Sequence, residues 1–473
     1  MKLFKKYFLL IICFLFFVVY SSLSIIHQQN FLSGGFDLGI YDQSIWQYSN
    51  LLYPFNTIKM KMILGDHLAL TLPLLAPLYW LWNDVRLLLL FQAAWISFSG
   101  IAIFKYLQVR KFTFYQSVIL TFIYLLFYGI QFAIYFDFHP VIIGVGLLAW
   151  ILYFWQVGKW RLFTASTILL LLTQENMGIA LSGLAAIWFF QGQRRKLAIL
   201  LGIIGIVSSF AAFEVVKFFA GGSSEYQPSL PRDISGYVTQ FFDSSEKREV
   251  WLYSLSWYSF LPLFSIGAML AFILDLSQYF LTGDAYSRMW SPFMHHRAVL
   301  SIFLLVGAAD VLLFLKSKKI NITHVILAML AVVLFLQWHF HFALNKLSKK
   351  EFVQTEAWIE NNREVLAEIP TGASVAAQQS LVPHLSHRKE IYLIYPSKNK
   401  LSADICPQKE CWWLNFSGSP EYLVVDMHQG ASLTMLLADL EQFREAIATM
   451  ERAGAIREYK RAGDAVLYKV VGT

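Results

Sequence analysis

The chain has 473 residues, of which 57% are hydrophobic and 17% are aromatic. Soluble globular domains contain roughly 45–50% apolar residues, so this composition excludes an ordinary soluble protein and indicates a polytopic membrane protein. The net charge of +7 does not indicate nucleic-acid binding, because the lysines and arginines fall in short clusters between apolar runs. In that position they orient helices in a bilayer.

The chain begins with Lys2, Lys5 and Lys6 and an apolar run over residues 5–26. No small-residue cleavage site follows, so we expect an uncleaved first helix with a cytoplasmic N-terminus. Further apolar runs, most of them near the roughly 20 residues that span a bilayer, lie at 86–104, 113–134, 138–157, 161–191, 197–219, 251–282, 297–315 and 320–342.

Cationic clusters at 105–111, 159–161, 194–196 and 316–319 separate these runs. All four can be cytoplasmic if the proline-bearing segment 67–82 only lies on or dips into the outer face. The runs 161–191 and 251–282 must then each form a hairpin of two short helices, the second broken near Pro262. This arrangement predicts about eleven transmembrane helices, with the C-terminus outside.

After residue 346 the long apolar runs end, and shorter strand and helix patterns follow. Segments 373–378, 390–395, 421–427 and 464–471 have the pattern of strands, and 349–369 and 434–454 have the pattern of helices. We therefore predict a transmembrane domain over 1–346, with a first external loop at 27–66, and a small external α/β domain over 347–473. The loop 220–233 is also expected outside. Cys406 and Cys411 could pair there, since disulfides form in oxidising compartments.

This topology places a set of acidic, imidazole and guanidinium side chains at external helix ends or in external loops. The acids include two first-loop carboxylates and one that interrupts an apolar run, where a charge is costly and tends to mark a functional interior. A positioned carboxylate can deprotonate a hydroxyl. The alternatives are solvated loop residues and a hairpin tip in water. The candidate catalytic acids are Asp37, Asp42 and Glu175.

Histidine can donate to a phosphate or act as a base near neutral pH, and arginine binds phosphate oxygens bidentately. A structural histidine and a snorkelling arginine anchor are the alternatives. The sequence requires no cofactor. It leaves a divalent metal ion open beside the acids, although no spacing matches a known metal motif. The candidate substrate-binding residues are His67, His139, Arg288, His295, His296 and Arg297.

Several segments taken in order resemble an uncharacterised family of prokaryotic multi-pass membrane proteins that is grouped with the GT-C glycosyltransferases. They are FDLGIYDQSIW, GDHLALTLPLLAPLYWLW, LLLLFQAAW, FDFHPVIIG, LLTQENMGIAL and SLVPHLSHRKEIYLIYP. The resemblance implies a GT-C-like helical fold in a prokaryotic plasma membrane and a polyprenyl-phosphate sugar as donor. It also implies that a first-loop acid, Asp37 or Asp42, is the general base. The chain departs from the family pattern at TQENM, which keeps only Glu175, and at MHHRAV.

The predicted function is that of a membrane enzyme that transfers a sugar from a polyprenyl-phosphate carrier to an external lipid, glycan or cell-wall acceptor. Asp42 is favoured over Asp37 as the base. We expect Asp37, Asp42, His67, His139 and Glu175 to line one cavity. The alternatives are a transporter or flippase for a lipid or polymer, and a non-catalytic membrane scaffold.

Overall fold

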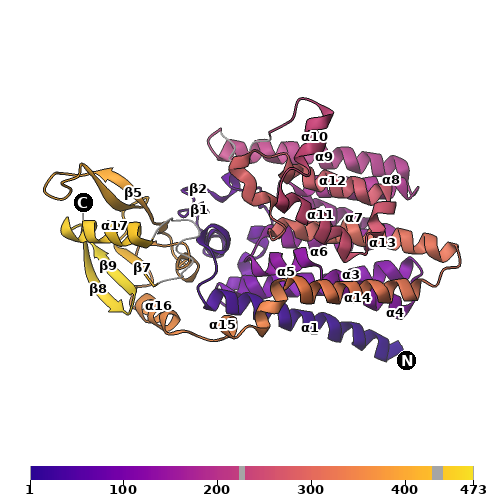
Figure 1. Cartoon of the computed structure of the whole chain (residues 1–473), viewed down its shortest axis with the longest axis horizontal. Coiled ribbons are helices and arrows are strands. Elements are labelled where there is room, and N and C mark those ends of the chain that lie inside the picture. Colours follow the sequence, from indigo (N-terminus) through magenta and orange to yellow (C-terminus); the bar gives the residue numbers. More distant parts are fainter. Residues whose placement is uncertain (1, 223–228, 429–439, 472–473) are drawn as a thin grey trace. The chain divides into compact units, whose positions relative to one another are not determined.

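The computed structural model describes residues 2–222, 229–428 and 440–471 (Figure 1). The chain forms two compact units, which are discontinuous in sequence. The helical unit comprises Met1–Ser24, Leu64–Thr71 and Leu89–Ser348, and the mixed unit comprises Ile25–Ile63, Leu72–Leu88 and Lys349–Thr473. The first external loop predicted at 27–66 therefore belongs largely to the same unit as the C-terminal tail. The continuous domains expected at 1–346 and 347–473 stay a prediction.

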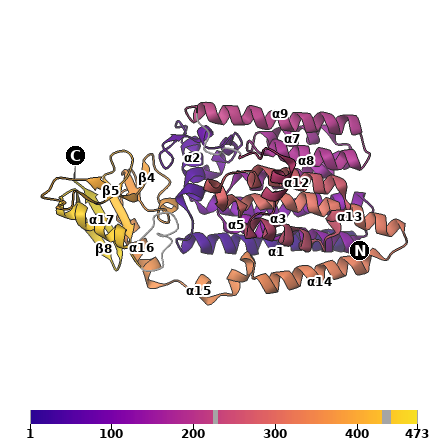
Figure 2. The ribbon, with the colours of Figure 1, turned by 45° about the horizontal axis from the view of Figure 1, so that its top comes forward.

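The helical unit is built from apolar helices, and α8 packs against both α9 and α12 (Figure 2). The rings of Trp155 and Trp188 stack at 4.1 Å inside it. Two helices, α1 (Lys2–Gln29) and α3 (Arg86–Val109), have residues in both units. The others are α4 (Phe114–Leu125), α5 (Tyr128–Tyr135), α6 (Pro140–Val157), α7 (Trp160–Leu171), α8 (Met177–Phe190), α9 (Arg195–Phe219), α10 (Ile234–Gln240), α11 (Ser245–Trp257), α12 (Ile266–Phe280), α13 (Leu300–Ser317) and α14 (Ile322–Phe340).

Six helices among the described residues are long and apolar enough to cross a membrane, or seven if the bent pair α4–α5 is one span. The two predicted hairpins are present as helix pairs, α7–α8 and α11–α12, and the break near Pro262 is the 3-10 turn η5 (Leu261–Phe264). The count of about eleven transmembrane helices is not confirmed, because α7, α8 and α12 have 12, 14 and 15 residues. A helix that short does not cover the roughly 30 Å hydrocarbon core unless the bilayer thins around it.

The four cationic clusters lie at one end of the helical unit. Arg110 forms an ion pair with Asp310 at 2.8 Å, and Lys316 donates to the Lys111 carbonyl at 2.9 Å. Arg194 donates to the carbonyl of Trp155, in the last turn of α6 before the 159–161 cluster, at 3.1 Å. Asp310 also accepts from Gln191, three residues before Arg194, at 3.0 Å, so these contacts join the clusters from distant parts of the chain. That the clusters share one side of the membrane stays a prediction.

The mixed unit combines the first-loop segments with the C-terminal sheet. Residues 35–49 form a π-helical turn, η1 (Gly35–Gly39), that continues as α2 (Ile40–Ser49). Segment 67–82, expected not to span, contains only short 3-10 turns, η3 (Leu72–Leu74) and η4 (Ala76–Trp80). The remaining elements are β1 (Phe55–Asn56), β2 (Lys61–Met62), α15 (Lys350–Val353), α16 (Ala357–Ala367), β3 (Val375–Ala377), η9 (Val382–His384), β4 (Ile391–Leu393), β5 (Tyr395–Lys400), β6 (Glu410–Asn415), β7 (Tyr422–Asp426), α17 (Leu440–Arg452), β8 (Ile456–Ala462) and β9 (Ala465–Val470).

The main sheet has the order β4-β3-β7-β9-β8. Strands β4, β3 and β7 run parallel to one another, and β9 pairs antiparallel with both β7 and β8. The four predicted strands correspond to β3, β4, β7 and β9. The helix expected at 349–369 is instead two helices, α15 and α16, and the one expected at 434–454 is described only from Leu440 onward as α17; residues 434–439 lie outside the described residues. Strands β5 and β6 form a separate hairpin, and the Cys406–Cys411 disulfide lies at its turn.

Candidate functional site

The first-loop acid Asp42 is completely buried in α2, with 0% of its surface exposed. Its carboxylate accepts hydrogen bonds from the hydroxyls of Tyr79, in η4, and Ser386. Nε2 of His387 lies 3.1 Å from Oδ1 and 3.0 Å from Oδ2 of Asp42. A buried carboxylate requires this kind of compensation, so the site is assembled from three segments that are remote in sequence.

The turn η1 allows α2 to approach the 378–388 segment closely. A Cβ atom added at Gly39 would lie 2.9 Å from Cγ1 of Val382, and one added at Gly35 would lie 2.9 Å from the Val382 Cβ. Such distances are too short for carbon atoms in contact. The two glycines therefore let the start of α2 pack directly on η9, which precedes Ser386 and His387 in the chain.

The neighbourhood of Asp42 shifts the pKa of two of its partners. Burial alone lowers the pKa of His387, but the charge and hydrogen bond of Asp42, together with the charge of Asp84, outweigh it, so the pKa lies above its usual value near 6.5. Burial and then Asp42 raise the pKa of Tyr79 well above its ordinary value. The Tyr79 hydroxyl thus stays protonated and donates, and the imidazole of His387 is a stronger base than a free histidine.

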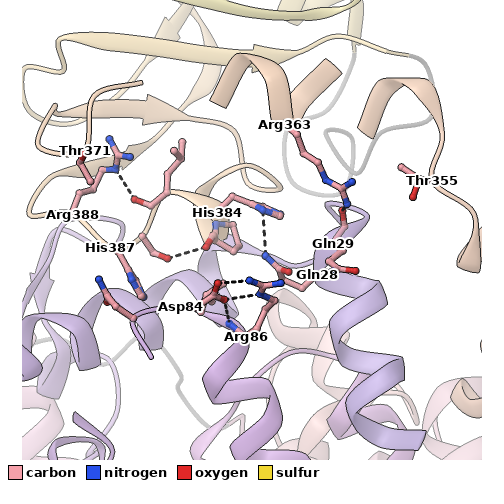
Figure 3. A pocket seen from close by; sticks show the side chains of 15 residues that line it. Gln28, Gln29, Asp84, Arg86, Thr355, Arg363, Thr371, His384, His387 and Arg388 are labelled. Atoms are coloured by element: carbon pink, nitrogen blue, oxygen red, sulfur yellow. Dashed lines mark hydrogen bonds and ion pairs between the residues drawn. The ribbon is translucent and has the colours of Figure 1, made fainter. Parts of the chain in front are cut away.

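His387 also borders a cavity of about 660 Å³ within the mixed unit (Figure 3). The lining contains three arginines and one aspartate, which give it a net charge of +2 when the histidines are counted as neutral. The side chain of His387 is 20% exposed. The charged and imidazole residues of the lining are Asp84, Arg86, Arg363, His384, His387 and Arg388.

Two of the cavity arginines are fixed by hydrogen bonds. Arg86 pairs with the carboxylate of Asp84 through Nε at 2.8 Å and Nη2 at 2.6 Å (Figure 3). Arg388 donates to the carbonyls of Leu385 at 2.6 Å and Ala373 at 2.9 Å, and burial lowers its pKa to about 10. Both guanidinium groups remain cationic at neutral pH, so the cavity is suited to an anionic group.

A separate polar cluster lies within the helical unit. Nδ1 of His67 lies 2.7 Å from Oε1 of Glu175, and the other oxygen of Glu175 accepts from the backbone of Leu68 at 3.1 Å. Glu175 occupies the turn between α7 and α8. The acid that interrupts an apolar run in the sequence therefore holds the 67–68 segment against a helical hairpin.

The remaining candidate histidines of this cluster are stacked. The His139 and His295 rings lie 3.7 Å apart, and His296 stacks on Tyr279 at 3.7 Å. Arg297 is fully buried and donates to the carbonyl of Met289 at 2.5 Å. Its guanidinium lies 5.2 Å from the centre of the Tyr279 ring.

The structure thus places the predicted site residues in two groups. His67, Glu175, His139, His295, His296 and Arg297 belong to the helical unit, while Asp37 and Asp42 belong to the mixed unit. Asp37 lies in η1 and Arg288 is exposed in η6 (Asp284–Trp290). A single cavity lined by Asp37, Asp42, His67, His139 and Glu175 stays a prediction. Over the described ranges, there is no cluster of three or more His, Cys, Asp or Glu side chains that could hold a metal ion.

The sequence interpretation missed the partners of Asp42. Tyr79 lies in the proline-bearing segment, and Ser386, His387 and Arg388 lie in SLVPHLSHRKEIYLIYP, a segment quoted above only for its resemblance to a family. The signal that could have found them is the density of polar and basic side chains after a predicted buried strand, β3. Ligand sites of α/β sheets lie at the carboxyl ends of parallel strands.

A family model described as predicted membrane protein (DUF2079) matches residues 27–432. No curated protein matches the chain. The matched residues include Asp42, His387, the charged residues of the cavity and the His67–Glu175 pair, so both polar clusters fall within the family's shared region.

Proposed function

The chain belongs to the DUF2079 family of predicted membrane proteins, and on that premise we propose that it is a membrane glycosyltransferase. The observation that carries the proposal is the buried Asp42–His387 pair beside a basic cavity. A lipid-phosphate sugar donor needs cations for its phosphate, and its acceptor needs a base. The predicted grouping of this family with the GT-C glycosyltransferases is part of the same proposal.

In this proposal His387 is the general base and Asp42 is a positioning residue. Asp42 does not line the cavity, and its oxygens bind Tyr79, Ser386 and His387. The acceptor hydroxyl gives its proton to Nδ1 of His387, and its oxygen forms a bond to C1 of the sugar. The C1–O bond to the phosphate breaks, and its electron pair leaves with the lipid phosphate. The carboxylate of Asp42 stabilises the resulting imidazolium, as a buried aspartate does for a catalytic histidine.

The cavity arginines are proposed to bind the phosphate of a polyprenyl-phosphate sugar. Guanidinium groups bind phosphate oxygens bidentately and remain charged. The acceptor is proposed to be a lipid, a glycan or a cell-wall polymer. His67 and Arg297, predicted as substrate contacts, and Glu175, predicted as a catalytic acid, belong to the helical unit, and their roles stay predictions.

We also propose that the mixed unit lies outside the cytoplasm of a prokaryotic cell, in a chain whose N-terminus is cytoplasmic. Two observations support this orientation. The cationic clusters gather at one end of the helical unit, as the positive-inside rule requires of cytoplasmic loops. The Cys406–Cys411 disulfide suits an oxidising compartment.

The proposal is tested by transfer from radiolabelled polyprenyl-phosphate hexoses to membrane lipids or glycans. His387→Gln should lower the rate by about 10²–10⁴-fold, the usual contribution of general-base catalysis. His324→Gln, at an exposed position of α14, is the matched control and should keep the wild-type rate. Equal rates for the two variants would contradict the assignment of the base.

Donor binding is tested separately with sugar-free polyprenyl phosphate. Arg363→Gln removes a cation from the cavity wall, so the affinity for polyprenyl phosphate should fall. Arg457→Gln removes an exposed cation elsewhere in the mixed unit and should leave the affinity unchanged. Binding that is insensitive to Arg363 would place the phosphate outside this cavity.

A second candidate function, transport of a lipid or polymer, is favoured by two buried ionisable side chains of the helical unit. Asp275 is 2% exposed and Arg297 0%. Asp275 Oδ2 and Arg297 Nη1 have no hydrogen-bond partner in the part of the chain that the structure describes. Charged groups inside a membrane domain often mark a transport pathway. A transporter would move a fluorescent polyprenyl phosphate across a vesicle membrane and lose that activity in Asp275→Asn but not in His387→Gln.

A further inference from the structure

Exposed apolar side chains of the mixed unit gather in two segments that follow α2 and precede α3. Leu51 is 90% exposed, Trp80 is 68% exposed and Leu81 is 85% exposed. Together, six side chains form what we call the aromatic surface: Leu51, Tyr53, Leu74, Trp80, Leu81 and Trp82. By contrast, the large apolar side chains exposed in the described part of 349–471 are scattered over α15, β5, β8 and the end of the chain: Val353, Tyr395, Tyr459 and Val471.

The two segments of the aromatic surface are held together. The indole N–H of Trp80 donates to the carbonyl of Ser49 at 2.8 Å, which fixes η4 against the end of α2. Tyr79 points inward and donates to Asp42, while its neighbours Trp80 and Leu81 are exposed. The outward direction of Trp80 and Leu81 therefore follows from a buried anchor.

The charges of these segments are of one sign. Residues 49–63 and 72–82 contain Lys59 and Lys61 and no aspartate or glutamate. Tryptophan and tyrosine are enriched at the headgroup level of membranes, and lysines are attracted to an anionic bilayer surface. Segments that carry exposed aromatic side chains and lysines, and no acids, match the chemistry of an anionic phospholipid surface.

The chain holds this surface close to the membrane boundary. The candidate spanning helix α3 begins at Arg86, four residues after Trp82. A fully extended chain covers at most about 3.6 Å per residue, so Trp82 lies within about 14 Å of the first residue of α3. The last residues of another candidate span, α1, also belong to the mixed unit.

We propose that the aromatic surface docks the mixed unit onto a phospholipid bilayer, with Trp80, Leu81 and Leu51 at the depth of the headgroups and Lys59 and Lys61 beside anionic lipids. An interfacial segment of this kind buries its apolar face about 5–10 Å into the headgroup and acyl boundary. The surface also brings the Asp42–His387 pair to the interface, because Tyr79 connects the two. The docking does not depend on the proposed transfer reaction.

Spin labels on the full-length protein test the proposal. The protein has three cysteines; Cys13 is buried and Cys406 and Cys411 form a disulfide, so an introduced thiol is the reactive one. Leu51→Cys and Leu81→Cys are labelled with a nitroxide in vesicles of phosphatidylethanolamine and phosphatidylglycerol. Tyr459→Cys is the control, because Tyr459 is 51% exposed in β8 of the same unit.

Collision rates with oxygen, which concentrates in the bilayer, and with a water-soluble nickel chelate give the depth of each label. We expect the ratio of oxygen to nickel collisions at positions 51 and 81 to exceed that at position 459 several-fold. Ratios equal to the control would show that the surface faces water and would overturn the proposal. A label at 51 or 81 that neither reagent reaches would show that protein covers the surface, which also overturns it.

Discussion

His387 and Asp42 are 345 residues apart in the sequence, yet Nε2 of His387 lies 3.1 Å from Oδ1 of Asp42. The pair joins the first-loop segment to the segment that follows β3 inside one compact unit. Because Asp42 is buried and pairs with His387, the surrounding structure is expected to depend on the protonation of His387.

The stability of the protein should therefore depend on pH through His387. Its folded-state pKa lies above the usual value near 6.5, so its contribution to the free energy of unfolding is fully present below that value. The contribution is lost as the pH rises through the folded-state pKa. The difference in thermal midpoint between wild type and His387→Gln should be largest below about pH 6.5 and should shrink as the pH rises above it. A difference that stays constant over this range would show that the pair does not titrate.

Asp42→Asn should destabilise the mixed unit without removing its volume. The amide presents one oxygen and one NH2 group to three groups that donate to the carboxylate, so a buried donor loses its acceptor. The expected loss in the free energy of unfolding is about 1–3 kcal/mol, measured by denaturant unfolding in detergent. Asp464→Asn, at an exposed turn between β8 and β9, is the control and should change little. A loss of equal size in both variants would mean that the contacts of Asp42 do not stabilise the mixed unit.

Gly39→Ala should destabilise the contact between η1 and η9. The backbone of Gly39 has φ −61°, which alanine adopts freely, so the cost comes from the 2.9 Å approach to Cγ1 of Val382. Overpacking of this kind costs about 1–3 kcal/mol. Val382→Ala removes that atom, so the double variant should be more stable than the sum of the two single losses predicts. If the losses in the free energy of unfolding were simply additive, the cost of Gly39→Ala would not come from the contact with Val382.

Reporter fusions test the proposed topology. A fusion after Lys346 should be external and one after Lys111 should be cytoplasmic, because the cationic clusters face the cytoplasm in the proposal. The disulfide gives a second measurement, since alkylation of Cys406 and Cys411 should require prior reduction. A cytoplasmic tail with two freely alkylated thiols would reverse the orientation of the mixed unit.

Local pattern predicted much of the fold. Apolar runs located the helices of the helical unit, and Pro262 located the break before α12. Strands β3, β4, β7 and β9 were predicted because they are buried and apolar. Strands β5 and β8 were missed because YPSKNK and IREYKRA are largely polar and exposed, so pairing with β6 and β9, and not burial, forms them.

The sequence by itself determined that the protein is a membrane protein, where its apolar helices lie and that Asp42 and Glu175 are unusual acids. Each of these follows from the chemistry of neighbouring residues along the chain. Only the tertiary structure decided that Asp42 binds His387 and Ser386 while Glu175 binds His67. Contacts across hundreds of residues depend on how helices and strands pack, and packing is set by shape complementarity over the whole unit. A local pattern of residues does not contain that information.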